Sequence, residues 1–68
     1  KNIAESRQVA MYLTRTMTKL PLIQIGEEFG GRDHGTVIHA CKVITNQIQN
    51  SQDFRRMVDN LGSKIRES

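Results

Sequence analysis

The stretch that decides the fold is residues 25–40, which read Ile25-Gly26-Glu27-Glu28-Phe29-Gly30-Gly31-Arg32-Asp33-His34-Gly35-Thr36-Val37-Ile38-His39-Ala40. Its first apolar residues, Ile25 and Phe29, lie four apart, which is the spacing of one face of a helix. Glycine adopts left-handed backbone angles without a steric penalty, so the pair Gly30-Gly31 predicts a sharp turn that ends this helix. Asp33 has the side chain of an N-cap, whose oxygen accepts from a free N–H in the first turn of the next helix.

Helical spacing continues upstream of this stretch. Ser6 is expected to cap a first helix, because its hydroxyl can accept from a free backbone N–H. The cap is followed by a stripe of apolar residues that lie three and four positions apart. That stripe consists of Val9, Leu13, Met17 and Leu20. Pro21 then marks either a stop or the first turn of a short helix over about residues 22–29.

Two further helices are expected after the glycine pair. The apolar face of the third helix is predicted to hold Val37, Ala40, Cys41, Ile44 and Ile48. Ser51 is expected to cap a fourth helix, over about residues 52–66. The apolar stripe of that helix is predicted to consist of Phe54, Met57, Val58, Leu61 and Ile65.

Composition narrows the class of protein. The 68 residues carry a net charge of +3, and their single cysteine, Cys41, excludes an internal disulfide. No apolar run approaches the ~20 residues of a membrane span, and no glycine-rich nucleotide loop of the GxxxxGK[ST] or GxGxxG type occurs. We expect an all-α fold, a small helical bundle that contains a helix-turn-helix at about 22–49 within a single domain, residues 1–68. A bundle with an ordinary tight corner between helices has the same periodicity, so spacing alone leaves both interpretations open.

Residues 25–40 closely resemble the signature of the C-terminal DNA-binding domain of bacterial DnaA, the family of chromosomal replication initiators. The run GGRDH followed by TVxHA is the most specific part of that resemblance, and residues 7–13 also resemble the family's preceding helix. The resemblance extends from about Ser6 to Ile44, and beyond Thr45 the chain reads as a generic closing helix. It implies non-catalytic, sequence-specific binding of double-stranded DNA at DnaA boxes of the replication origin.

The resemblance also implies a larger context. The family's full-length protein has a separate ATP-binding domain, so we expect no cofactor in this fragment and no enzyme activity from it. A basic loop that precedes this region in the family sends an arginine into the minor groove, and this chain starts at or near the end of that loop. We further expect one monomer on each box, no membrane contact by this fragment, and a cytoplasmic, nucleoid-associated location.

Three residues at the start of the third helix are the candidates for base contact: Asp33, His34 and Gly35. By pattern, Asp33 is a helix cap, and the resemblance adds a base contact, since a carboxylate can accept from cytosine N4 or adenine N6. The resemblance assigns His34 to a base edge in the major groove. Gly35 departs from the family, which usually has a threonine whose methyl packs on a thymine methyl, so we expect weaker discrimination at one base.

Five further residues are the candidates for contact with the DNA backbone: Gln8, Arg15, Thr36, His39 and Lys42. The resemblance assigns Gln8 and Arg15 to the backbone, and Thr36 matches the family there. His39 and Lys42 lie on the face opposite the predicted core, where they are either merely solvated or flank phosphates. Some family members have a basic residue at the position of Val43, so one phosphate contact is expected to be absent.

Two alternatives to origin recognition remain open. The chain has the features of a helix-turn-helix module from a transcription regulator, and those of a helical protein-interaction module that buries an apolar face around Ile38 and Val43. A metal site is disfavoured, because His34 and His39 are five apart and Cys41 points to the core face. Cys41 has no partner base in the sequence and is interpreted as a core residue.

Overall fold

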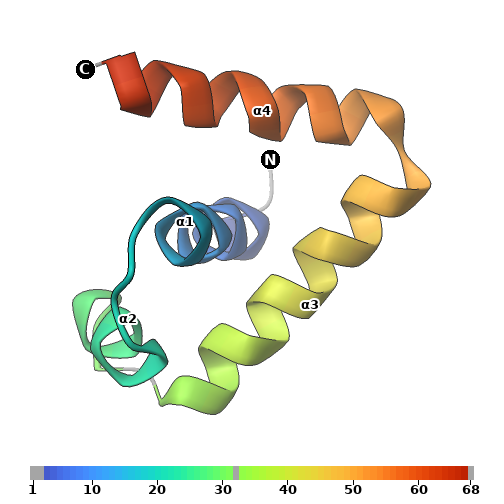
Figure 1. Ribbon diagram of the computed structural model, residues 1–68. Coiled ribbons are helices and arrows are strands. Elements are labelled where there is room, and N and C mark those ends of the chain that lie inside the picture. Colours follow the sequence, from blue (N-terminus) through green and yellow to red (C-terminus); the bar gives the residue numbers. More distant parts are fainter. Residues whose placement is uncertain (1–2, 32, 68) are drawn as a thin grey trace.

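Helix α3 is the element against which the rest of the chain packs. The computed structural model describes residues 3–31 and 33–67, which form α1 (Ile3–Met17), α2 (Leu22–Glu28), α3 (His34–Asn50) and α4 (Gln52–Glu67), with no strand in those two ranges. Figure 1 shows α3 running diagonally past α1 and α2, and α4 crossing above α1, which is seen end-on. The expected all-α fold with a helix-turn-helix is confirmed.

The core consists of two clusters that α3 joins. In the first, α1, α3 and α4 bury Val9, Leu13, Ile44 and Val58. In the second, α1, α2 and α3 bury Met11, Ile25, Val37 and Ala40. Because α3 contributes to both clusters, its apolar face fixes the positions of α2 and α4 relative to α1.

The start of α1 differs from the expectation. Helix α1 begins at Ile3, so Ser6 lies inside it and the prediction that Ser6 is the N-cap is wrong. Glu5 lies in the first turn, where a carboxylate interacts favourably with the positive end of the helix dipole. The helix tolerates this earlier start because residues 3–5 contain no proline or glycine.

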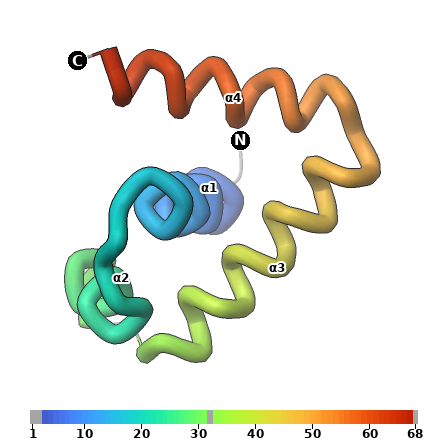
Figure 2. The backbone as a smooth tube through the Cα atoms, in the orientation of Figure 1, coloured from blue at the N-terminus to red at the C-terminus, as the bar shows by residue number. Residues whose placement is uncertain are grey.

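The connections on either side of α2 follow local chemistry. Pro21 is the N-cap of α2, with φ −64° and ψ 153°, and its carbonyl accepts from the Ile25 N–H at 3.0 Å. Helix α2 ends at Glu28, and Phe29 is its C-cap rather than its last residue. Gly30 and Gly31 both have positive φ, 91° and 76°, which confirms the expected left-handed turn after α2. Figure 2 shows α2 lying close to the start of α3.

Helix α4 buries few of its residues against the other helices. Its cap is the expected one, since the Phe54 N–H donates to the Ser51 hydroxyl at 3.2 Å. Val58 and Gly62 are its buried residues, and Phe54 is half-buried. The other three members of the predicted stripe are exposed, namely Met57 at 41%, Leu61 at 40% and Ile65 at 55%. The structure leaves this part of the apolar stripe uncovered, because α4 crosses α1 instead of lying along it (Figure 1).

Candidate nucleic-acid interface

The start of α3 is organised by the side chain of Asp33. This residue is the N-cap of α3, and its Oδ1 accepts from the Thr36 N–H at 2.9 Å and from the Thr36 hydroxyl at 2.9 Å. The predicted cap is therefore confirmed. The hydrogen bond from the Thr36 N–H, then that from the Thr36 hydroxyl, and the nearby His34 hold the pKa of Asp33 below its ordinary value. The carboxylate is thus ionised at neutral pH.

These two hydrogen bonds determine which carboxylate oxygen of Asp33 is left to contact a ligand. Both bonds fall on Oδ1, and among the described residues Oδ2 accepts no hydrogen bond. Asp33 can therefore cap α3 through one oxygen and accept from a ligand through the other. The Thr36 hydroxyl, in contrast, already donates its proton to Asp33, so donation to a phosphate would require that bond to be exchanged.

The three candidate base contacts lie together at this exposed end of α3. Asp33, His34 and Gly35 are all exposed, and they follow directly from the Gly30-Gly31 turn. A Cβ atom built on Gly35 would lie 3.6 Å from Asp33 Oδ1, which is an ordinary van der Waals distance. The position therefore has room for a Cβ atom.

The candidate backbone contacts come from two helices. His39 and Lys42 are exposed on α3, on the side opposite the buried Val37 and Ile44. On α1, Arg15 is exposed and Gln8 is half-buried. Residues seven apart lie on the same side of a helix, so Gln8 and Arg15 form one line along α1.

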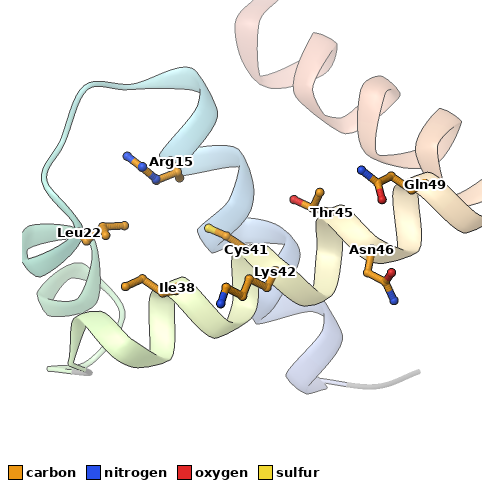
Figure 3. Close-up of a pocket in the computed structure, with 8 residues that line it drawn as sticks. All are labelled: Arg15, Leu22, Ile38, Cys41, Lys42, Thr45, Asn46 and Gln49. Atoms are coloured by element: carbon orange, nitrogen blue, oxygen red, sulfur yellow. The ribbon is translucent and has the colours of Figure 1, made fainter.

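A groove connects Arg15 with Lys42. It has a volume of about 370 Å³, and Figure 3 shows Arg15 and Leu22 across from a row of residues on α3. That row consists of Ile38, Cys41, Lys42, Thr45, Asn46 and Gln49. The groove thus combines two cationic side chains with apolar and amide groups, which suits the phosphates and sugars of a nucleic-acid strand.

Most of the groove residues were not recognised in the sequence. Ile38, Lys42, Thr45 and Gln49 repeat at helical spacing, which is the pattern that could have indicated a second face on α3. The opposite wall could not have been found that way, because Arg15 and Leu22 approach α3 only through the packing of α1 and α2 against it.

Cys41 is half-buried and lines the same groove. It also packs against the cluster of Met11, Ile25, Val37 and Ala40, as its predicted place on the core face requires. Burial raises the pKa of the Cys41 thiol, and the smaller effect of Arg15 in the opposite direction does not offset it. The thiol is therefore protonated at neutral pH, which is the unreactive form.

Helix α4 carries its own group of exposed charged residues. Arg55 and Asp59 of α4 form an ion pair at 3.8 Å, but both side chains are about two-thirds exposed, so the pair adds little to stability. Within residues 3–31 and 33–67, no group of three or more histidine, cysteine or acidic side chains is placed to hold a metal ion. Over the same ranges, no helix has the length and apolar character needed to cross a bilayer.

The structure thus contains a short helix, α2, a turn at two glycines, and a longer helix, α3, whose exposed start carries polar side chains. This is the helix-turn-helix arrangement that many DNA-binding proteins have. Residues 1–44 match the family model of the bacterial DnaA protein helix-turn-helix, and the chain belongs to that family. Its class is therefore that of DNA-binding proteins of replication initiation. No solved structure matches the chain.

Proposed function

We propose that this chain binds DnaA boxes in duplex DNA at the bacterial replication origin, with one monomer on each asymmetric box. The observation that carries the proposal is the start of α3, where Asp33, His34 and Gly35 lie exposed beyond the Gly30-Gly31 turn. In helix-turn-helix proteins this end of the second helix meets base edges in the major groove. Membership of the DnaA family supports the choice of the DnaA box as the site.

Each candidate residue has a role in this proposal. Asp33 accepts from cytosine N4 or adenine N6 through Oδ2 while Oδ1 caps the helix, and His34 contacts a neighbouring base edge. Arg15 and Lys42 bind phosphates from the two walls of the groove, which fixes the position of α3 on the duplex. Gln8, Thr36 and His39 add polar contacts to the same backbone.

The proposal includes the wider context of the chain. The function needs no cofactor and no catalysis in these residues, and ATP belongs to a separate domain of the full-length initiator. The protein acts in the cytoplasm on the nucleoid.

Fluorescence anisotropy with a labelled DnaA-box duplex and a scrambled duplex, at two salt concentrations, tests the proposal. We expect tighter binding to the box, and an affinity that falls with salt at a slope of roughly −0.9 per neutralised phosphate. Equal affinity for both duplexes would contradict box recognition. Selection of a different sequence from random duplexes would favour a transcription-regulator module, and no binding at low salt would favour a protein-interaction module.

Two variants separate the roles within that assay. Asp33→Ala is expected to flatten the preference for the box more than it weakens binding to the scrambled duplex. Lys42→Ala is expected to weaken both duplexes alike and to reduce the salt slope by about 1. Arg66→Ala, which removes the same charge from α4, is the matched control and should change the slope less. An equal loss on both duplexes for Asp33→Ala, or a loss confined to the box duplex for Lys42→Ala, would contradict these assignments.

A further inference from the structure

The outer side of α4 carries apolar side chains beside a groove. Met57 and Leu61 are both exposed, and they lie four residues apart, on the same side of the helix. The groove has a volume of about 380 Å³ and runs along this side of α4. Its lining residues, which we call the outer face of α4, are Asp53, Arg56, Met57, Asn60, Leu61 and Lys64.

The outer face is distinct from the side on which α4 packs against its own chain. Val58 and Gly62 are the buried residues of α4. Each residue turns an α-helix by about 100°, so Met57 and Leu61 lie to one side of this buried pair. The apolar surface of α4 is therefore wider than its contact with α1 and α3. An exposed apolar surface with a polar rim marks an interaction site.

The charges at the two ends of the outer face have opposite signs. Asp53 lies in the first turn of α4 and Lys64 lies in the last turn, with the apolar pair between them. Met57 and Leu61 are each two residues from position 59 along the chain. Asp53 and Lys64 are six and five residues from that position. Rotation of the outer face by half a turn about this level thus places an acid where the base was, and a base where the acid was.

A second copy of the same chain fits such a face, because a two-fold interface brings the same patch of both copies together. With two α4 helices antiparallel, Met57 contacts Leu61 of the second copy, and Asp53 meets Lys64 of the second copy at both ends. The Lys64 ammonium has three donors, so it can bind this carboxylate together with a partner in its own chain. We propose that the outer face of α4 is a self-association surface that pairs two copies of this chain antiparallel.

Other arrangements match the charges less well. A parallel pair would place Asp53 against Asp53 and Lys64 against Lys64, and like charges at an interface are unfavourable. An acidic partner would suit Arg56 and Lys64 but would meet Asp53 with a like charge. The antiparallel pair is the one in which both ends carry opposite charges.

This surface leaves the DNA-binding end of each copy accessible. Figure 1 shows α4 at one end of the molecule and the start of α3 at the other. Each copy can therefore still bind its own box, and the pair would join two boxes. One helix from each copy forms the contact, so the interface falls in the small class that buries less than about 1,200 Å² and is typical of weak, transient association.

Sedimentation equilibrium without DNA tests the proposal, at protein concentrations up to about 1 mM, where weak complexes are populated. For the unchanged protein we expect the average mass to rise from that of the monomer toward that of the dimer. Asp53→Lys and Lys64→Asp each place like charges at both ends, and each should weaken self-association by at least about ten-fold. An equal mixture of the two variants has opposite charges at both ends of a mixed pair, so it should associate about as tightly as the unchanged protein.

Three further variants control for charge and for apolar exposure. Asp59→Lys makes the same change of charge as Asp53→Lys on another side of α4, where Asp59 pairs with Arg55, and it should leave self-association unchanged. Leu61→Ala should weaken self-association. Ile23→Ala shortens an isoleucine that is 64% exposed on α2 and should not weaken it. Circular dichroism at the same concentrations checks that each variant is folded.

Several outcomes would overturn the proposal. A monomer at every concentration is one, and a shift of the Leu61 methyl resonances on addition of polyglutamate would then assign the outer face to an acidic partner. Equal weakening by Asp53→Lys and Asp59→Lys, or a mixture of folded variants that stays monomeric, would exclude the antiparallel pair. Equal weakening by Ile23→Ala and Leu61→Ala would indicate unspecific apolar association. No DNA is present, so each of these results is independent of box recognition.

Discussion

At the scale of single residues, Asp33 combines a structural and a recognition role in one side chain. Its Oδ1 accepts two hydrogen bonds from Thr36 at 2.9 Å each, so the start of α3 depends on this carboxylate before any DNA is bound. A base contact through Oδ2 would therefore come from an oxygen that is already held in place. Because the cap and the base contact use different atoms, they can be separated by substitution.

The cap of Asp33 predicts a dependence of stability on pH. The pKa of this carboxyl is lowered in the folded state from its ordinary value of 3.8, so its contribution is present above that value and is lost as the pH falls toward the folded pKa. Asp33→Asn retains an oxygen that accepts from the Thr36 N–H but cannot titrate, whereas Asp33→Ala removes the cap. Thermal unfolding followed by circular dichroism should give a lower midpoint for Asp33→Ala at neutral pH.

The acid range provides the control for this prediction. Below the ordinary value of 3.8, the midpoint of the unchanged protein should fall faster than that of Asp33→Asn. Parallel curves for the two proteins would mean that the charge of Asp33 contributes nothing to the cap.

Gly35 predicts a gain of specificity on substitution. The Cβ of Gly35→Thr would meet Asp33 Oδ1 at 3.6 Å, so the backbone need not move. The added methyl could reach a thymine, and helix α3 would lose a glycine that costs about 0.5–1 kcal/mol relative to alanine. Affinities for boxes altered at each position should show sharper discrimination at one base, and an unchanged profile would contradict the role of position 35.

At the scale of elements, α4 is the least covered helix. Gly62 lies at its contact with α1, where an added Cβ would lie 3.5 Å from Leu13 Cδ2 and 3.9 Å from Met17 Sδ. Both are ordinary contact distances, so the crossing tolerates one methyl group and little more. The glycine therefore weakens α4 without being required by the packing.

Gly62→Ala is expected to stabilise the protein by about 0.5–1 kcal/mol, because alanine has the higher helix propensity and the methyl fits against Leu13. Gly62→Leu, with a larger side chain at the same crossing, should instead lower stability. Urea unfolding measures both, and DNA affinity should stay constant in Gly62→Ala because α4 is remote from the start of α3. A lower midpoint for Gly62→Ala would mean that α4 lies closer to α1 than these distances indicate.

At the scale of the whole molecule, two small clusters joined by α3 hold the site together. Ile44 is completely buried in the cluster that α1, α3 and α4 share, while Ile25 and Val37 are completely buried in the other. A folded chain of this size is stable by only several kcal/mol. Loss of one central contact should therefore affect the binding face through the fold as a whole.

Ile44→Ala is expected to lower the free energy of unfolding by about 2–5 kcal/mol, since it removes buried methyl groups and leaves a cavity. The apparent affinity for DNA should fall with the folded fraction, and saturating box duplex should restore part of the thermal midpoint. Ile65→Ala, at an exposed position of α4, is the control and should change the midpoint little. An Ile44→Ala variant as stable as the unchanged protein would contradict the role of this cluster.

The sequence by itself determined most of the features that depend on neighbours within about four positions, and the expected cap at Ser6 is the exception, since α1 begins at Ile3. The cap at Asp33, the cap at Ser51 and the left-handed turn at Gly30-Gly31 are of this kind, and each lies where the sequence predicts it. Their energies come from hydrogen bonds and backbone angles inside one turn of chain, so tertiary packing had little to change. The family signature in residues 25–40 likewise identified the helix-turn-helix and its family.

The tertiary structure alone decided which faces are covered and which distant residues meet. Met11 is buried although it lies off the main stripe of α1, because α2 packs on that second side. Leu61 is exposed although it lies on the stripe of α4, because α4 crosses α1 at one point. The groove joins Arg15 to Lys42 for the same reason, since the angle and distance between helices depend on every side chain at their contact and not on the spacing within either one.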